Sequence, residues 1–186
     1  MTRIVAGTVG GRRIEVPRSG TRPTSERVRE ALFARLEHYG VLDGAQVLDL
    51  CAGSGALGLE AASRGAGDVT LVDSSRAASE ICRRNIRALG LRGLRVVTAK
   101  AAAFLTGAAG APVDLVLIDP PYELAEEGLT AILSPLTRSE DPWLAPRAVV
   151  VVERSTRSPE PAWPQGLGRF ADKRYGETTL WFAEPL

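Results

Sequence analysis

The segment Asp119-Pro120-Pro121-Tyr122 carries the residue types in this chain that are best suited to chemistry. It follows residues 113–118, a short apolar run rich in β-branched side chains that predicts a buried strand. Two prolines cannot continue a sheet, because neither has an N–H group to donate. Asp-Pro alone would be an ordinary turn. With the second proline and the tyrosine, we predict a ligand site at the carboxyl end of the strand, where open α/β sheets bind ligands.

These groups suit methyl transfer to an exocyclic amine of a nucleobase. Such an amine is a poor nucleophile, because its lone pair is delocalised into the ring. The carboxylate of Asp119 and the carbonyl of Pro120 can accept the two amine hydrogens, so that charge developing on nitrogen meets preorganised acceptors. Pro121 helps to fix the direction of that carbonyl. The ring of Tyr122 can stack on a base that has left its helix.

A second cluster lies in residues 49–58, Asp-Leu-Cys-Ala-Gly-Ser-Gly-Ala-Leu-Gly, between a predicted strand and a predicted helix. Gly53, Gly55 and Gly58 have the spacing G-x-G-x-x-G, and Asp73 follows 20 residues after Gly53 at the end of the next predicted strand. The glycines let a ligand approach the backbone, and the start of the helix offers N–H donors. The carboxylate of Asp73 can accept hydrogen bonds from both hydroxyls of a ribose.

This spacing suits both NAD and S-adenosylmethionine, since both contain an adenosine ribose. Asp49, just ahead of the glycines, favours S-adenosylmethionine. Its carboxylate can meet the cationic amine of the methionine part, but it would be poorly placed beside a pyrophosphate. NAD binding also gives no reason for the segment 119–122. We therefore predict S-adenosylmethionine as the cofactor and keep an NAD-dependent oxidoreductase as an alternative.

The remaining elements predict a doubly wound α/β fold. Strands alternate with helices, which implies right-handed crossovers and a parallel sheet, and the last two strands form an antiparallel pair. The predicted strands are residues 46–50, 69–73, 94–97, 113–119, 148–152, 170–175 and 178–182, and the predicted helices are residues 56–64, 75–89, 101–105 and 124–136.

Ahead of this pattern, residues 4–6 and 13–16 predict a glycine-rich hairpin, and residues 17–23 a connector. A helix then begins with Thr24 as its N-cap and ends at Gly40, with one apolar face packed on the body of the protein. Arg27 and Arg29 fall away from the apolar stripe, and we predict that they are free to bind a ligand.

Basic residues concentrate at the amino-terminal end. Residues 1–29 contain seven arginines against two glutamates, whereas the whole chain has a formal net charge of only +1. This asymmetry is compatible with a polyanionic partner and equally with a solvated arginine-rich arm.

The composition also excludes several classes of protein. Cys51 and Cys82 lack metal-ligand spacing and form no disulfide framework, and His38 is the only histidine. We therefore predict no metal. The chain has no membrane-spanning apolar run and does not begin with a signal peptide, so we predict a cytoplasmic protein.

The chain resembles the RsmD-type guanine-N2 methyltransferases of small-subunit (16S) ribosomal RNA. The glycine loop is shared by many methyltransferases, and Asp-Pro-Pro-Tyr by adenine-N6 enzymes. Residues 22–30, Arg-Pro-Thr-Ser-Glu-Arg-Val-Arg-Glu, are the family-specific part. The resemblance is carried by residues 3–7, 11–14, 22–30, 49–60 and 119–122.

This resemblance implies a Rossmann-like class I methyltransferase sheet of seven strands, the last antiparallel. It assigns residues 41–186 to an S-adenosylmethionine-dependent methyltransferase domain and residues 1–40 to a basic, RNA-facing hairpin and helix. The implied partner is small-subunit ribosomal RNA in an assembling or assembled particle. The implied catalytic residues are Asp119, Pro120, Pro121 and Tyr122. The implied RNA-binding residues are Arg3, Arg12, Arg13, Arg22, Thr24, Arg27 and Arg29. The implied cofactor-binding residues are Asp49, Cys51, Ala52, Gly53, Ser54, Gly55, Asp73, Ser74, Lys100 and Ala101.

The sequence departs from the family in one place. Such enzymes usually carry Asp or Asn after the third strand to meet the adenine, whereas this chain has Ala99-Lys100-Ala101. We therefore expect backbone groups at Lys100 and Ala101 to take that role. Two further alternatives stay open: an adenine-N6 methyltransferase of DNA or RNA, because adenine also presents an exocyclic amine, and a non-catalytic RNA-binding assembly factor.

Overall fold

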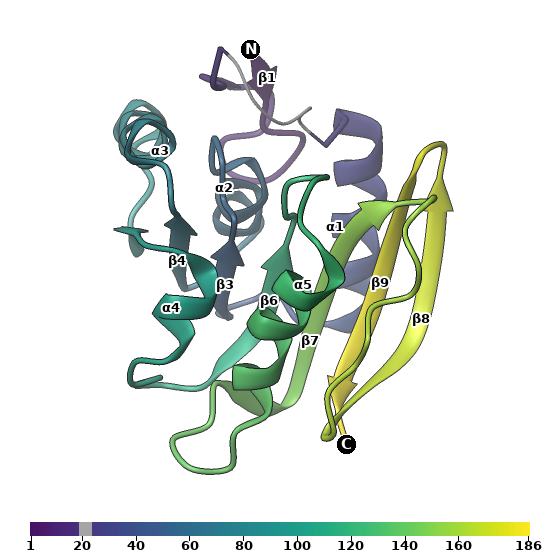
Figure 1. The fold of residues 1–186 in the computed structure, drawn as a ribbon. Helices are drawn as coiled ribbons and strands as arrows, with labels where there is room; N and C mark the ends of the chain where they lie inside the picture. Colours follow the sequence, from purple (N-terminus) through teal and green to yellow (C-terminus); the bar gives the residue numbers. More distant parts are fainter. Residues whose placement is uncertain (19–23) are drawn as a thin grey trace.

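The structure is a computed structural model that describes residues 1–18 and 24–186. Its centre is a seven-stranded sheet with the strand order β5-β4-β3-β6-β7-β9-β8 (Figure 1). Strands β3 to β7 are parallel, and β9 runs antiparallel to both of its neighbours. The predicted α/β sheet of seven strands with an antiparallel last strand is therefore confirmed. The strands are β3 (Gln46–Leu50), β4 (Asp68–Asp73), β5 (Leu94–Thr98), β6 (Val113–Ile118), β7 (Leu144–Ser155), β8 (Leu167–Tyr175) and β9 (Thr178–Pro185).

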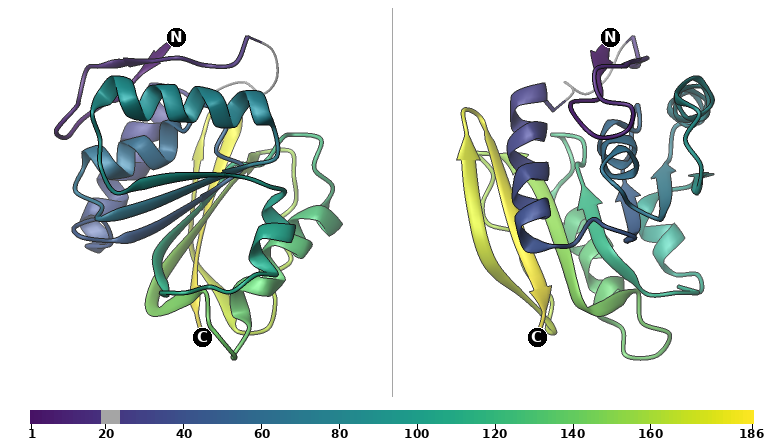
Figure 2. Two further views of the ribbon diagram at one scale, coloured as in Figure 1. Left: turned by 90° about the vertical axis from the view of Figure 1, so that its left-hand side faces the viewer. Right: turned by 180° about the vertical axis from the view of Figure 1, so that it is seen from behind.

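Helices cover both faces of this sheet (Figure 2). One face carries α1 (Glu26–Tyr39), α2 (Ala56–Ser63) and α3 (Arg76–Leu89). The other carries α4 (Ala101–Leu105), α5 (Glu126–Leu133) and the 3₁₀ turn η1 (Ser134–Thr137). The valine run of β7 is buried on both faces, as a central strand of such a sheet requires.

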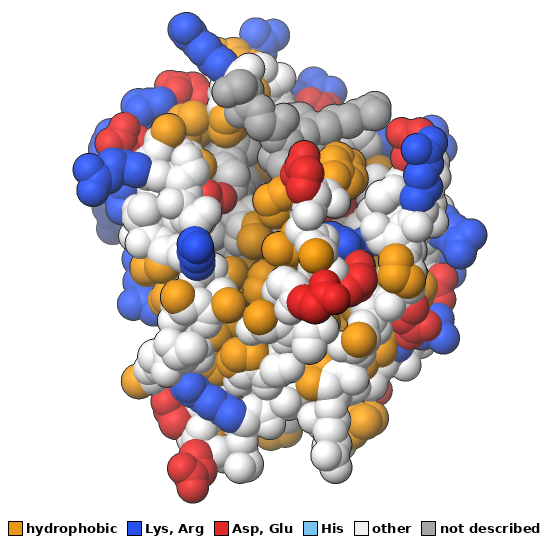
Figure 3. Space-filling view, viewed as in Figure 1, with side chains coloured by type: hydrophobic (Ala, Val, Ile, Leu, Met, Phe, Trp, Pro, Cys, Tyr) orange, Lys and Arg blue, Asp and Glu red, His pale blue; other side chains and the backbone are white. Residues whose placement is uncertain are grey.

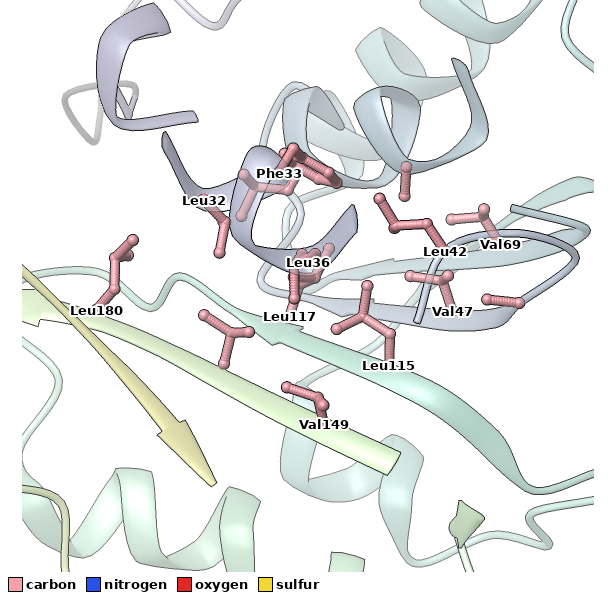
Figure 4. Close-up of a cluster of buried hydrophobic side chains, with 14 of the residues drawn as sticks. Leu32, Phe33, Leu36, Leu42, Val47, Val69, Leu115, Leu117, Val149 and Leu180 are labelled. Carbon is pink, nitrogen blue, oxygen red and sulfur yellow. The ribbon is translucent and has the colours of Figure 1, made fainter. Parts of the chain in front are cut away.

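The helix α1 packs its apolar stripe directly on the sheet. Leu32 and Leu36 lie with Leu117, Val149 and Leu180 in one buried cluster (Figure 4). The stripe predicted from helical spacing is thus confirmed. The N-cap is Ser25 and not Thr24, because the Ser25 Oγ accepts the N–H of Val28 at 3.2 Å.

The amino-terminal hairpin has shorter strands than predicted, and hydrogen bonds hold it on α2. Its strands are β1 (Thr2–Arg3) and β2 (Arg13–Ile14). The buried carboxylate of Glu60 accepts the N–H of Val5 at 2.8 Å and of Ala6 at 3.0 Å. Gly7, at φ 86°, passes so close to α2 that a Cβ there would lie 2.0 Å from the Ser63 carbonyl oxygen. These contacts fix the position of the hairpin on α2.

Arg29 departs most from its prediction. Its side chain is completely buried, its Nε lies 3.3 Å from Glu60, and its Nη2 donates to the carbonyl of Arg3. Burial lowers the pKa of Arg29, and the charge of Glu60 acts against that shift. The prediction that Arg29 is free to bind RNA is therefore wrong. Arg29 instead connects α1 with α2 and the hairpin. Helical spacing could not predict this burial, because Glu60 lies 31 residues further along the chain.

No helix in residues 1–18 and 24–186 is long and apolar enough to cross a membrane.

Candidate active site

Four acidic side chains gather where neighbouring strands of the sheet end. Asp49 belongs to β3 and Asp73 ends β4. Asp119 follows β6, and the register of β6 and β7 carries it to the position next to Glu153. The residues predicted for the cofactor and those predicted for catalysis therefore lie along one edge of the sheet, at the carboxyl ends of its parallel strands.

The glycine loop is shaped by Asp73. Its Oδ2 accepts the N–H of Gly53 and its Oδ1 the N–H of Ser75, each at 2.8 Å. Gly53 (φ 59°) and Gly55 (φ 85°) adopt left-handed backbone conformations, as does Cys51 (φ 62°), for which this conformation is costly. Each Asp73 oxygen retains a second lone pair, so the carboxylate that orders the loop can still accept hydrogen bonds from a ribose.

Two further predicted residues support the loop from the protein side. The N–H of Ala52 donates to the carbonyl of Val72 at 3.0 Å. The carbonyl of Ser54, a buried residue, accepts the side-chain amide of Asn85 at 2.9 Å, and the same amide donates to the carbonyl of Glu15. Asn85 thereby ties the amino-terminal extension to the glycine loop.

Asp49 has the properties expected of a group that receives a cation. Its Oδ2 accepts the N–H of Gly58 at 2.8 Å, while its Oδ1 is buried without a hydrogen-bond partner among the described residues. Burial, and then the charges of Asp119 and Asp73, raise the pKa of Asp49 to about 8. A buried acceptor with an unused oxygen fits the cationic amine of S-adenosylmethionine.

A small pocket of about 90 Å³ joins the two clusters. Ser74 and Ala101 are predicted cofactor residues that line it, whereas Lys100 is exposed at the start of α4 and makes no side-chain cap bond. Val72 and Ala99 also line this pocket but were not among the predicted cofactor residues, and their signal in the sequence is their place at the ends of neighbouring strands. The lining residues are Cys51, Val72, Asp73, Ser74, Ala99, Ala101 and Pro121.

The motif after β6 combines a fixed backbone with an accessible ring. Pro120 is buried, Pro121 is exposed at the small pocket, and Tyr122 is 54% exposed. Arg154, which the sequence analysis missed, fixes the chain that follows. Its Nη2 donates to the carbonyl of Leu124 at 3.0 Å and also pairs at 2.7 Å with a glutamate of α5.

Thr24 was predicted to bind RNA together with the arginines, but the structure places its side chain beside Asp119. Its Oγ1 is 3.0 Å from Asp119 Oδ2 and 2.8 Å from Glu153 Oε2. Glu153 is only 7% exposed, and the sequence analysis missed it, because a charged residue after a valine run is expected to face solvent. Thr24, which precedes the N-cap residue of α1, is therefore bonded to the predicted catalytic carboxylate.

The other arginines predicted to bind RNA have differing surroundings. Arg3 pairs with a glutamate of α1 at 2.9 Å, and Arg12 donates to two backbone carbonyls in the last turn of α3. Arg13 and Arg27 are exposed. Arg22 lies outside the described residues. In Figure 3 basic side chains gather over α3, on the left of the view.

The two cysteines are unpaired thiols. Burial raises the pKa of both Cys51 and Cys82 to about 12, so both are protonated at neutral pH and poorly suited to act as nucleophiles. In the part of the chain that the structure describes, no group of three or more His, Cys, Asp or Glu residues is arranged to hold a metal ion.

This sheet, with its glycine loop and with Asp-Pro-Pro-Tyr at the carboxyl edge, defines a Rossmann-like class I methyltransferase. The solved structure of Escherichia coli yhhF superimposes with a TM-score of 0.84 at 37% identity, over 99% of this chain and 97% of that one. A hypothetical protein of Thermus thermophilus gives a TM-score of 0.82 at 31% identity, over 99% of both chains.

The sequence comparisons identify the family. The model described as "Conserved hypothetical protein 95" matches residues 2–184. Ribosomal RNA small subunit methyltransferase D of Escherichia coli K12 is 39% identical over 94% of this chain and 85% of its own length. Its namesake in Haemophilus influenzae is 34% identical over 84% and 80%. The chain therefore belongs to the family of ribosomal RNA small subunit methyltransferase D.

The state of Asp49 can be tested through the protons exchanged on cofactor binding. An ionised Asp49 would pair with the cofactor amine, so binding should lower its pKa from about 8 and release up to one proton at pH 7. The affinity should accordingly rise by up to about tenfold per pH unit and level off near pH 8. Calorimetry of S-adenosylmethionine binding in buffers of different ionisation enthalpy measures the released proton.

The isosteric variant Asp49→Asn is the control for this measurement. It should bind more weakly and release no proton. Equal proton release by both proteins would assign the proton to another group.

Proposed function

We propose that this protein transfers a methyl group from S-adenosylmethionine to the N2 amine of a guanine in small-subunit ribosomal RNA. The observation that supports this most directly is that Pro121 of the motif lines one small pocket together with Cys51 of the glycine loop and Asp73. The names of the relatives supply the class of RNA. The choice of guanine rests on the family resemblance, since the four residues of the motif would also suit adenine.

S-adenosylmethionine would supply a methyl group on a positively charged sulfur. Asp49 would hold its amine, Asp73 its ribose, and backbone groups near Ala101 its adenine. The acidic edge of the sheet favours this positively charged cofactor over its neutral product. On the substrate side, Asp119 and the Pro120 carbonyl would accept the amine hydrogens, which orients the nitrogen lone pair toward the methyl group.

Tyr122 would hold the substrate base. A base inside an RNA helix cannot bring its amine to the carboxyl edge of the sheet, so it must leave the stack. The half-exposed ring of Tyr122 offers a surface for stacking, worth about 1–3 kcal/mol for a single-stranded base. The chain after it is fixed by Arg154, which limits the entropy that the ring loses when a base binds.

The modified nucleoside decides between the two bases. Mass-spectrometric mapping of small-subunit RNA from a strain lacking this protein should show the loss of one N2-methylguanosine. Purified protein with S-adenosylmethionine should restore it, on naked RNA or on subunit particles. Loss of an N6-methyladenosine would instead establish the adenine alternative. A protein that binds the RNA without methylating it would be an assembly factor, and a protein that binds only NAD would contradict the proposal.

Residues 1–40 form the proposed RNA-facing part of the protein, acting in the cytoplasm on an assembling or assembled subunit. Replacing the exposed Arg13 and Arg27 by alanine should weaken RNA binding, and each lost phosphate contact should reduce the slope of log K against log salt by about 1. Filter binding at several salt concentrations measures this slope. The matched control is Arg147→Ala, which is exposed near the opposite end of the sheet, beside Asp114 at the start of β6. An equal loss in the control would mean that binding follows net charge and not this surface.

A further inference from the structure

The hydroxyl of Thr24 lies close to two carboxyl oxygens but has one hydrogen to donate. Its oxygen is within hydrogen-bond distance of Asp119 Oδ2 at 3.0 Å and of Glu153 Oε2 at 2.8 Å. A hydroxyl has one hydrogen to donate, and an ionised carboxylate has none. Both contacts are hydrogen bonds only if one of the two carboxyl groups is protonated and donates to the threonine oxygen.

The positions of the two carboxyl groups decide which of them keeps the proton. Asp119 begins the motif whose Pro121 lines the small pocket, so the amine of the substrate would arrive at this carboxyl group. Glu153 lies one strand further from the cofactor pocket and is 7% exposed, with β9 on its other side. Asp119 is the carboxyl group that the substrate can reach, and Glu153 the one that the fold encloses.

We propose that Glu153, Thr24 and Asp119 form a hydrogen-bonded relay in which the protonated carboxyl of Glu153 donates to Thr24 and the Thr24 hydroxyl donates to the Asp119 carboxylate. Glu153 and Thr24 are thus positioning residues that act through Asp119. This relay rests on the proposed function, because its purpose is to keep Asp119 ionised while it accepts hydrogens from the amine.

The electrostatics agree with this order of protonation. Burial, and then the negative charge of Asp119, raise the pKa of Glu153 to about 8. Burial raises the pKa of Asp119 to about 6, while the hydrogen bond from Thr24 lowers it. The pKa of the enclosed Glu153 is raised further than that of Asp119, in agreement with the positions of the two carboxyl groups in the fold. Among the described residues, the carboxyl group of Asp49 on β3 interacts with Asp119, whereas the neighbouring Arg154 is directed to α5.

The relay also accounts for the proton released in the reaction. The nitrogen lone pair would form the bond to the methyl carbon that S-adenosylmethionine supplies, the electrons of the carbon–sulfur bond would remain on sulfur, and the nitrogen would then lose one proton. Asp119 Oδ accepts that proton and passes it to solvent after the product leaves. If Asp119 itself were protonated beforehand, it would lack this capacity and would offer the amine one acceptor fewer.

Two variants of Glu153 test whether its side chain acts as a hydrogen-bond donor, which requires the protonated carboxyl group. The amide of Glu153→Gln can donate to Thr24 as the protonated acid does, so this variant should keep most of the activity that Glu153→Ala loses. The expected loss for the alanine variant is about ten- to hundredfold in kcat, the worth of one hydrogen bond to a charged group. A Glu153→Gln variant as inactive as Glu153→Ala would overturn the relay, as would full activity in both variants.

Variants of Thr24 test the middle of the relay. Thr24→Val has nearly the same shape without a hydroxyl, so the acidic limb of the pH profile of kcat/KM should move to higher pH, because the pKa of Asp119 loses the bond that lowers it. Thr24→Ser should restore the wild-type limb. An unmoved limb in Thr24→Val would contradict the inference. Thr130→Val on α5, whose hydroxyl donates to the carbonyl of Glu126 in the same helix at 3.0 Å, is the matched control.

A measurement without cofactor or RNA distinguishes failure of the relay from failure of the proposed function. The pKa of Glu153 is raised in the folded state, so its contribution to stability is present at low pH and lost as the pH rises through about 8. Glu153→Gln lacks this loss and should gain in thermal stability over wild type between pH 6 and pH 9. A difference in Tm that is constant with pH would overturn the relay, even in an active enzyme. An inactive wild type that shows the predicted change would instead overturn the proposed function alone.

Discussion

Replacing Asp119 by asparagine is expected to lower kcat for RNA methylation by about 10³-fold, the range seen when a preorganised group at the reacting atom is removed. Asparagine keeps the shape of the side chain and can still bond Thr24, but it offers one acceptor oxygen and no negative charge to an amine that becomes positively charged. The carboxylate matters most as the bond to the methyl group forms, so KM should change far less than kcat. Single-turnover assays with saturating S-adenosylmethionine measure the effect.

The fold should survive this change. The pKa of Asp119 is raised in the folded protein, so the carboxylate costs stability above about pH 6, and the neutral amide avoids that cost. Asp114→Asn is the matched control, because it lies on the same strand at its other end, where its Oδ2 accepts the N–H of Gln46 at 2.8 Å. Undiminished methylation by Asp119→Asn would rule out the proposed role of the motif.

Replacing Arg29 by methionine is expected to have the largest effect on stability. The change removes the guanidinium that pairs with the buried carboxylate of Glu60. Breaking a buried ion pair by removing one partner costs about 3–5 kcal/mol. The hairpin should also lose order, since Glu60 accepts two of its backbone N–H groups and the Arg29 Nη2 donates to its Arg3 carbonyl. Urea unfolding gives the change in free energy, and hydrogen exchange of the hairpin amides gives its location.

Arg27→Met on the same helix is the control for Arg29→Met. Arg27 is exposed, so its replacement should change the free energy of unfolding by less than about 0.5 kcal/mol while weakening RNA binding. The deciding measurement is the free energy of unfolding, because loss of order in the hairpin would also weaken RNA binding through Arg13. A loss of stability in Arg29→Met no larger than in Arg27→Met would contradict the structural role of the buried ion pair.

The predictions from sequence succeeded where the determining residues lie close together along the chain. The prolines after Ile118 end a strand wherever it is placed, and the stripe from Val28 to Leu36 defines one face of a helix. The predicted fifth strand was too short, because β7 continues from its valines through Glu153 and Arg154. Charged residues normally end such a run, and here both are buried with partners supplied by other elements.

Residue types and their spacing were enough to predict the order of the elements, the glycine loop with Asp73, and the acid, prolines and ring at the end of β6. These follow from backbone restrictions and periodicities that act within a few residues. The environment of each charged side chain, in contrast, depends on the three-dimensional fold. Thr24 bonds Asp119 and Glu153 across 95 and 129 positions, and Arg29 meets Glu60 from another helix. Protonation and burial depend on such distant neighbours, because the cost of a buried charge is set by every group that packs around it.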